Sequence, residues 1–219
     1  MSGPALPEDF DGKVRLFPLP NLVMFPGVVQ GLHIFEPRYR QMVADALSGD
    51  RIIGMTLLKA QASADEARPA VYPVGCSGVI THVERLADGR YHLILRGVEK
   101  FQIVGEEASA PGQLYRTAHV STCDEPIGAA DREALAYERR RLEARLAPLL
   151  ERGRAESFLS QTMPDVDLVN ALAQYLEFEP VERQALLEQP GPLARCRAMM
   201  ELLDLKALLE KTSPTDTLH

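Results

Sequence analysis

Hydrophobic and polar residues alternate in short runs over the first half of the chain, and glycine or proline separates the runs. Such runs of β-branched and aromatic residues are typical of β-strands. The pattern predicts six strands, at about 13–17, 28–34, 52–58, 74–86, 91–104 and 113–122. Asp88-Gly89 lies between the two longest and favours a hairpin turn, because both residues tolerate positive φ. Six strands suit a partly closed barrel, which limits exposed strand edges.

Prolines interrupt this pattern early in the chain. Pro18 and Pro20 are expected to end the first strand, because proline cannot donate to a strand ladder. Pro26 and Gly27 suit a tight turn. A single helix is predicted among the strands at 36–47, where Pro37 occupies an early position that needs no N–H donor.

After Pro126 the apolar spacing becomes helical. One stripe is formed by Leu135, Leu142, Leu146 and Leu149. Further helices are predicted to begin after 164–165, at 179–180 and at 192, and residues 213–219 are expected to fray. The predicted fold class is α+β, with a β-rich unit over 1–125 and a helical bundle over 126–219.

The charge balance argues against a nucleic-acid-binding surface. The 219 residues carry a net charge of −7. Lys and Arg number 12 against 15 Asp and Glu in residues 1–125, and 12 against 16 after them. Non-specific binding to nucleic acid depends on clustered Lys and Arg, so neither half is a basic module. The three arginines at 139–141 are interpreted as a solvated helix face, because Glu138 and Glu143 flank them.

Other features predict a cytoplasmic protein that does not enter a membrane. No apolar run reaches the roughly 18 residues that span a bilayer, and the N-terminus lacks the basic start and apolar core of a secretory signal. Three well-separated cysteines, without a CxxC pair, predict reduced thiols rather than a disulfide framework or zinc site: Cys76, Cys123 and Cys196.

Catalytic motifs are not found in the sequence. It lacks a Walker A segment, a dinucleotide fingerprint, a G-x-S-x-G elbow and an H-E-x-x-H pair. If Asp88-Gly89 is a two-residue turn, residue i faces residue 177 − i, and His82 and His92 point to opposite sheet faces. A loop with an odd number of residues would undo that exclusion. We expect no catalytic residue, no metal and no cofactor, with Cys76 as a buried filler.

The ordered segments nevertheless resemble one family. FPLPNLVMFPGVVQGLHIFEPRYRQMVADALSGDRIIGM resembles the start of the Lon N-terminal domain, also called the Lon substrate-binding domain. A second stretch is similar to the family's Asp-Gly hairpin and its Arg-Gly-x-x-Arg/Lys-Phe-x-Ile pattern, which falls on Arg96, Gly97, Lys100, Phe101 and Ile103. Residues 164–203 resemble its helical tail. The resemblance covers about residues 13–211 and implies a PUA-like β barrel followed by a helical bundle.

The same resemblance implies a function through contact. Full Lon proteases continue into ATPase and peptidase domains, for which this sequence shows no motif, so a stand-alone bacterial domain without catalysis is expected. In full-length members this domain contributes to substrate recognition, which implies polypeptide segments or an unidentified protein as partners. The candidate contact residues are Met24 and Phe25 beside the Pro-Gly turn, and Phe35, Arg38 and Tyr39 at the strand-to-helix junction. Each has an alternative interpretation as ordinary core.

Two other functions compete with this one. PUA-like barrels often bind RNA, although the even acidity opposes that role here. An enzyme with a cleft between barrel and bundle would need a nucleophile, base or metal set that the sequence does not display. The oligomeric state is left open.

Overall fold

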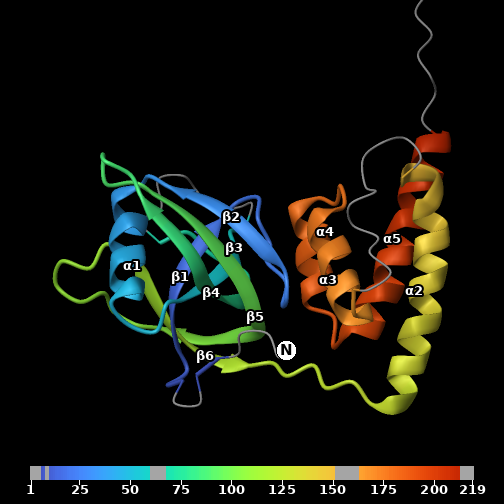
Figure 1. The fold of residues 1–219 in the computed structure, drawn as a ribbon, viewed down its shortest axis with the longest axis horizontal. Coiled ribbons are helices and arrows are strands. Elements are labelled where there is room, and N and C mark those ends of the chain that lie inside the picture. Colours follow the sequence, from blue (N-terminus) through green and yellow to red (C-terminus); the bar gives the residue numbers. More distant parts are fainter. Residues whose placement is uncertain (1–5, 8–9, 60–67, 151–162, 213–219) are drawn as a thin grey trace, which may run out of the picture. The chain divides into compact units, whose positions relative to one another are not determined.

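The computed structural model describes residues 6–7, 10–59, 68–150 and 163–212 (Figure 1). The fold is α+β, as predicted. Two compact units are present, one made of Met1–Asp124 with Asn170–Glu188 and the other of Glu125–Val169 with Gln189–His219. A stretch of the predicted helical bundle thus groups with the strands. The predicted division into a β-rich part over 1–125 and a helical part over 126–219 stays a prediction. The predicted frayed tail, 213–219, and most of the predicted loop at 61–70 lie outside the described residues.

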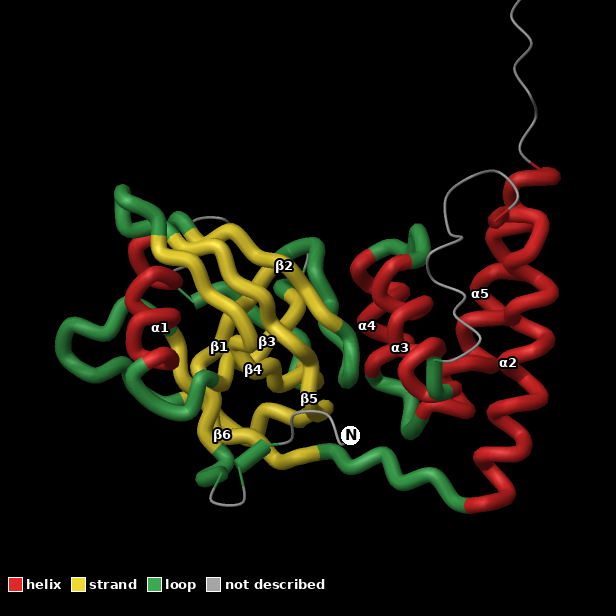
Figure 2. The backbone as a smooth tube through the Cα atoms, viewed as in Figure 1, coloured by secondary structure: helices red, strands yellow, loops and turns green. Residues whose placement is uncertain are grey.

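Six strands form one sheet in the first unit. They are β1 (Lys13–Leu19), β2 (Val29–Ile34), β3 (Ile52–Leu57), β4 (Val74–Arg85), β5 (Tyr91–Glu106) and β6 (Arg116–Thr122). The strand order is β2-β5-β4-β3-β1-β6, and β5 also pairs with β6. Five strands therefore close into a barrel, and β2 is attached outside the closed ring on the first half of β5. Figure 2 shows this wrapped sheet. The six predicted strands are confirmed to within a few residues at their ends.

Buried side chains of the first unit gather in two clusters, one around Met55, Ile80 and Leu95 and the other around Leu16 and Phe101. The clusters lie on opposite faces of β1, because Leu16 and its neighbour Phe17 belong to different ones. The alternation of β5 is clear, since residues 91, 93 and 95 are buried while 92 and 94 are exposed. Period-two burial of this kind is what a sheet with one solvated face requires.

Helix α1 (Pro37–Leu47) lies against the barrel (Figure 2). Its buried face repeats at three- and four-residue steps, through Tyr39, Met42, Val43 and Ala46. Glu36 precedes it in an extended conformation, and Pro37 occupies the first turn, as predicted.

Two sequence-based expectations about the strands are wrong. β1 continues through Pro18 to Leu19 and pairs there with β3. Pairing of β1 with β6 ends at Leu16, so Pro18 has a strand on one side only and needs no donor toward the other. The β4–β5 hairpin is also shifted by one residue, because the Leu86 N–H donates to the Arg90 carbonyl (2.9 Å) and encloses a three-residue loop.

Helical residues of the first unit satisfy backbone groups of the barrel. They come from the end of α3 (Asp165–Tyr175) and from α4 (Pro180–Leu187). The Gln174 side-chain oxygen accepts from the Phe25 N–H (3.0 Å), and Asn170 Nδ2 donates to the Pro26 carbonyl (3.0 Å). Buried backbone groups need such partners, so these amides explain why 170–188 groups with the strands.

The second unit is built on α2 (Ala129–Leu150) and α5 (Pro192–Thr212), which pack together. Its core includes Leu135, Leu142 and Leu146 of the predicted stripe. No helix in the described ranges is both long enough and apolar enough to cross a membrane.

A buried ion pair and a second arginine complete this unit. Arg195 is fully buried and meets the Glu125 carboxylate, with Nη1 3.2 Å from Oε2. The interpretation of 139–141 as solvated is wrong for Arg139, which is 9% exposed and pairs with Asp165 (2.7 Å) and Glu143 (2.8 Å). Asp165 begins α3, so chain folding brings a distant acid to this arginine.

Candidate functional site

The structure separates the five predicted contact residues into two groups. Met24, Phe25 and Tyr39 are buried, at 1%, 0% and 5% exposure. Phe35 is 59% exposed and the Arg38 side chain is 48% exposed. The predicted residues thus do not form one exposed apolar patch in this structure, and only the second group is open to a partner. Their role in binding stays a prediction.

Close backbone approach explains why Phe25 is buried. A Cβ atom at Gly97 would overlap the Phe25 carbonyl oxygen, so only glycine permits this contact. The Gly27 N–H donates to the Gly97 carbonyl (2.9 Å), and Gly27 has a φ of 78° in the turn predicted from Pro26-Gly27. The turn is therefore clamped onto β5, and its apolar residues face inward.

Tyr39 has a structural position beside the exposed Arg38. Its ring lies 4.4 Å from the Phe17 ring, between centroids, and its hydroxyl donates to the Pro18 carbonyl (3.3 Å). Burial raises the pKa of Tyr39. The Arg38 guanidinium lies 4.6 Å above the centre of the Tyr39 ring and also pairs with Glu36 (2.7 Å). Arg38 thus covers the outer face of a core tyrosine.

Phe35 belongs to an exposed aromatic patch that we define as Phe35, His33 and His92. The Phe35 and His33 rings are stacked with centroids 6.0 Å apart, and the His33 and His92 centroids are 4.7 Å apart. His33 and His92 are direct partners in the β2–β5 ladder. This patch is not predicted from the sequence, where His92 has a partner only within the Asp88-Gly89 hairpin.

The observed hairpin register also changes the predicted orientations of His82 and His92. His92 faces Glu84, whose carboxylate lies 3.6 Å from Nδ1, and His82 faces Ile94. His82, Glu84, His92 and Ile94 are all exposed, so His82 and His92 share a face instead of pointing apart. Even so, no group of three or more His, Cys, Asp or Glu side chains within the described ranges is arranged to hold a metal ion.

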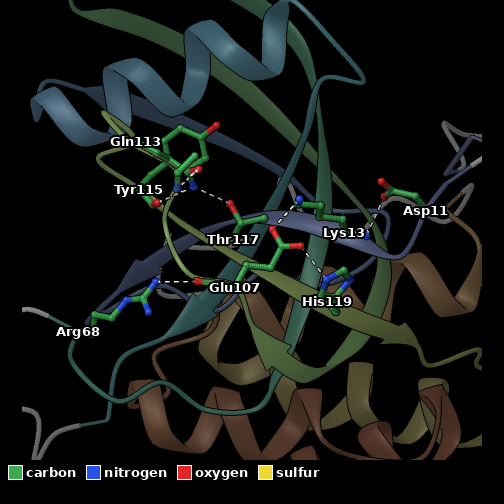
Figure 3. Close-up of polar contacts among 9 residues, drawn as sticks. Asp11, Lys13, Arg68, Glu107, Gln113, Tyr115, Thr117 and His119 are labelled. Carbon is green, nitrogen blue, oxygen red and sulfur yellow. Dashed lines mark hydrogen bonds and ion pairs between the residues drawn. The ribbon is translucent and has the colours of Figure 1, made fainter.

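A second polar cluster lies on the outer surface of the barrel where β1, β5 and β6 meet. Figure 3 shows Glu107 between Lys13 (Oε2 to Nζ, 2.6 Å) and His119 (Oε1 to Nε2, 2.8 Å). The contact with Lys13 lowers the pKa of Glu107. Lys13 and His119 are partners in the β1–β6 ladder. Because Lys13 and His119 engage both carboxylate oxygens, the cluster fits a structural tie better than an acid–base pair.

A hollow of about 450 Å³ opens beside this region. It is lined by Arg68, Ala70, Val71, Pro73, Ile103, Glu106 and Arg116. Arg116 Nε donates to the Glu106 carboxylate (2.8 Å) and lowers the pKa of Glu106, while Arg116 Nη1 donates to the Pro69 carbonyl (2.7 Å). The Arg116 guanidinium charge is thus already compensated by Glu106.

Comparisons with known proteins agree with the fold and with the segments quoted above. The family model described as the ATP-dependent protease La (LON) substrate-binding domain matches residues 13–204. Lon protease 2 of Syntrophobacter fumaroxidans is 33% identical over 186 residues, and Lon protease 2 of Myxococcus xanthus is 27% identical over 211 residues. These matches cover 84% and 94% of this chain, but 23% and 25% of the relatives. The chain therefore spans about a quarter of their length.

Solved structures match over most of the chain. The Lon N-terminal domain protein from Xanthomonas campestris matches with a TM-score of 0.56 at 22% identity, covering 88% of this chain and 97% of that one. The N-terminal domain of the Mycobacterium avium complex Lon protease matches with a TM-score of 0.64 at 19% identity, covering 88% and 98%. At these identities the likeness concerns the fold alone, whereas the family model covers most of the sequence. The chain therefore belongs to the Lon substrate-binding domain family.

Proposed function

We propose that this chain is a non-catalytic module that binds exposed apolar or extended segments of other polypeptides. The family model supports this, because the domain that it describes is the substrate-binding part of an ATP-dependent protease. The polar clusters of the barrel add a chemical argument, since Arg116 holds the carboxylate of Glu106 and Lys13 holds that of Glu107. Carboxylates held in this way stabilise the surface of the barrel, and binding by contact requires no reactive group.

The aromatic patch is the surface that we assign to this binding. The observation that carries the assignment is the exposure of Phe35, which is 59% exposed and lies in the chain between β2 and α1. A large apolar side chain held on a rigid scaffold is the usual anchor of a protein interface. His33 and Arg38 flank it and offer a polar rim. Tyr39 supports Arg38 from the core, whereas Met24 and Phe25 are buried.

Fluorescence anisotropy with an unfolded polypeptide tests the proposal. Reduced, carboxymethylated α-lactalbumin carries the label, and the native disulfide-bonded form is the control. We expect the unfolded form to bind in the micromolar range and the native form to bind at least tenfold more weakly. Equal affinity for both forms, or binding to neither, would contradict the proposal. Intact mass measurement of the probe afterwards should show no cleavage.

The compartment belongs to the same proposal. We place the protein in the cytoplasm, which is supported by the free thiols of Cys76, Cys123 and Cys196. RNA binding, the alternative raised by the barrel, has no support in the family match or in the matched structures.

A further inference from the structure

Strand β2 has one paired edge and one unpaired edge. It pairs with β5 over residues 29–34, and the barrel closes without it through the β5–β6 pairing. In the part of the chain that the structure describes, no strand pairs with the other edge of β2. An open edge presents unpaired N–H and C=O groups, which proteins usually cover or block.

The register shows which residues of β2 face that edge. The Gly97 N–H donates to the Val28 carbonyl (2.8 Å), which makes this a hydrogen-bonded position of the ladder. Bonded and non-bonded positions alternate in an antiparallel pair. Val29, Gly31 and His33 therefore direct their main-chain N–H and C=O groups away from β5.

Side chains of the same unit confirm this direction. The Tyr175 hydroxyl donates to the Val29 carbonyl, and Gln30 Nε2 donates to the Gly31 carbonyl (2.9 Å). The edge is thus capped by side chains near its start. Toward its end, no side chain of the described residues caps the main chain of His33, which is contacted only at its ring by Arg90.

The face of the sheet at the centre of β2 is also open, in the direction in which a Cβ atom would point out of the sheet plane. A Cβ atom at Gly31 would meet no heavy atom within 4 Å. Gly31 lacks the positive φ of Gly27 and Gly89, so its backbone is ordinary strand. The aromatic patch begins two residues later, with the His33 and Phe35 rings 6.0 Å apart.

We propose that an extended segment of another polypeptide adds to β2 as a further strand. The outward N–H groups of Gly31 and His33 are two residues apart, or ~6.8 Å, and alternate with the carbonyl oxygens of the same residues. The Gly31 carbonyl would exchange its bond from Gln30 Nε2 for a main-chain donor of the added strand. An extended main chain matches that spacing on both counts, which is the basis of recognition by strand addition. Alternate side chains of the added strand would then contact the aromatic patch. This inference rests on the proposed function and specifies the form in which the polypeptide is bound.

Two substitutions at one position test the inference. Gly31→Pro removes the outward N–H and places a ring on the edge, and edge strands tolerate proline where the N–H faces solvent. Gly31→Ala keeps the N–H and puts its Cβ in open space. With labelled carboxymethylated α-lactalbumin, we expect Gly31→Pro to bind about tenfold more weakly, as for loss of one hydrogen bond and its geometry. Gly31→Ala should bind within twofold of the wild type.

The outcomes separate the two proposals. If the wild type binds and both Gly31 variants bind equally well, strand addition is wrong while the proposed function stands. If the wild type does not bind, the proposed function fails and the inference fails with it. Light scattering without the probe gives another contradicting result, a wild-type dimer that Gly31→Pro dissociates, because the edge would then serve a second copy of this chain.

A second measurement covers the case in which Gly31→Pro does not fold. Site-resolved amide exchange by NMR follows the wild-type Gly31 and His33 amides with and without the probe. Strand addition predicts at least tenfold slower exchange at both amides in the complex. Unchanged exchange at both would overturn it.

Discussion

The imidazole rings of His33 and His92 face each other across the β2–β5 pair, with centroids 4.7 Å apart. This pairing connects the outermost strand to the barrel on its exposed face, and Phe35 extends it toward α1. His33 and His92 of the aromatic patch therefore stand on paired strands, and Phe35 lies in the short junction between β2 and α1.

Replacement of Phe35 tests the patch itself. Phe35→Ala removes an exposed ring, so it should leave the melting temperature within about 2 °C while weakening binding of the unfolded probe about tenfold. Val104→Ala is the matched control, because Val104 is 73% exposed on the half of β5 that pairs with β6. Anisotropy titrations compare the two variants. If they lose affinity equally, the patch has no special role.

Gly97→Ala should destabilise the first unit strongly. The added Cβ would overlap the Phe25 carbonyl oxygen, so the Pro26-Gly27 turn must move. We expect a loss of ~2–4 kcal/mol in the free energy of unfolding, at the upper end for overpacking. Gly105→Ala on the same strand meets nothing within 4 Å and should change it by less than ~0.5 kcal/mol. Urea denaturation measures both, and similar values for the two variants would contradict the close approach.

The buried pair of Arg195 and Glu125 gives a prediction for the second unit. Glu125→Gln removes the carboxylate charge that pairs with the fully buried Arg195, and loss of one member of a buried pair costs ~3–5 kcal/mol. Asp204→Asn breaks the ion pair with Arg145. The side chains of both residues are about half exposed, so the free energy of unfolding should fall by less than ~1 kcal/mol. Thermal unfolding followed by circular dichroism distinguishes them. A Glu125→Gln protein as stable as Asp204→Asn would show that the buried pair is not structural.

Glu99 predicts a pH dependence of stability. Burial, followed by its hydrogen bond with Asp124, raises the pKa of Glu99 to about 7 from the ordinary 4.5. Between these values the folded state holds a proton that the unfolded state has released, so this group's stabilising contribution falls as pH rises from about 4.5 to 7. Glu99→Gln should therefore gain stability relative to the wild type between pH 5 and pH 8. Urea denaturation at the two pH values measures the gain, and an unchanged difference would exclude the raised pKa.

Local patterns predicted most of the barrel but little of the proposed binding surface. The six strands follow from residue alternation, which depends on neighbours along the chain. The burial of Phe25 depends on Gln174, which is 149 positions away and holds its N–H. The pairing of His33 with His92 depends on the β2–β5 register.

Similar reasons explain the remaining errors. The parity of the β4–β5 hairpin depends on a single loop residue, because Leu86 bonds to Arg90 across three residues. Arg139 is buried by Asp165, which is 26 positions away. No periodicity signals such long-range contacts. Phe35, which the sequence offered as a candidate contact residue at the strand-to-helix junction, is exposed in the structure.

Hydrogen–deuterium exchange of the complex with unfolded α-lactalbumin tests the central claim most directly, namely that this domain acts by holding polypeptide at β2 and the start of α1. Peptides covering residues 29–39 should exchange more slowly when the probe is present, and those covering 13–19 of β1 should not change. Protection confined to other segments, or no protection at a saturating probe concentration, would contradict the account.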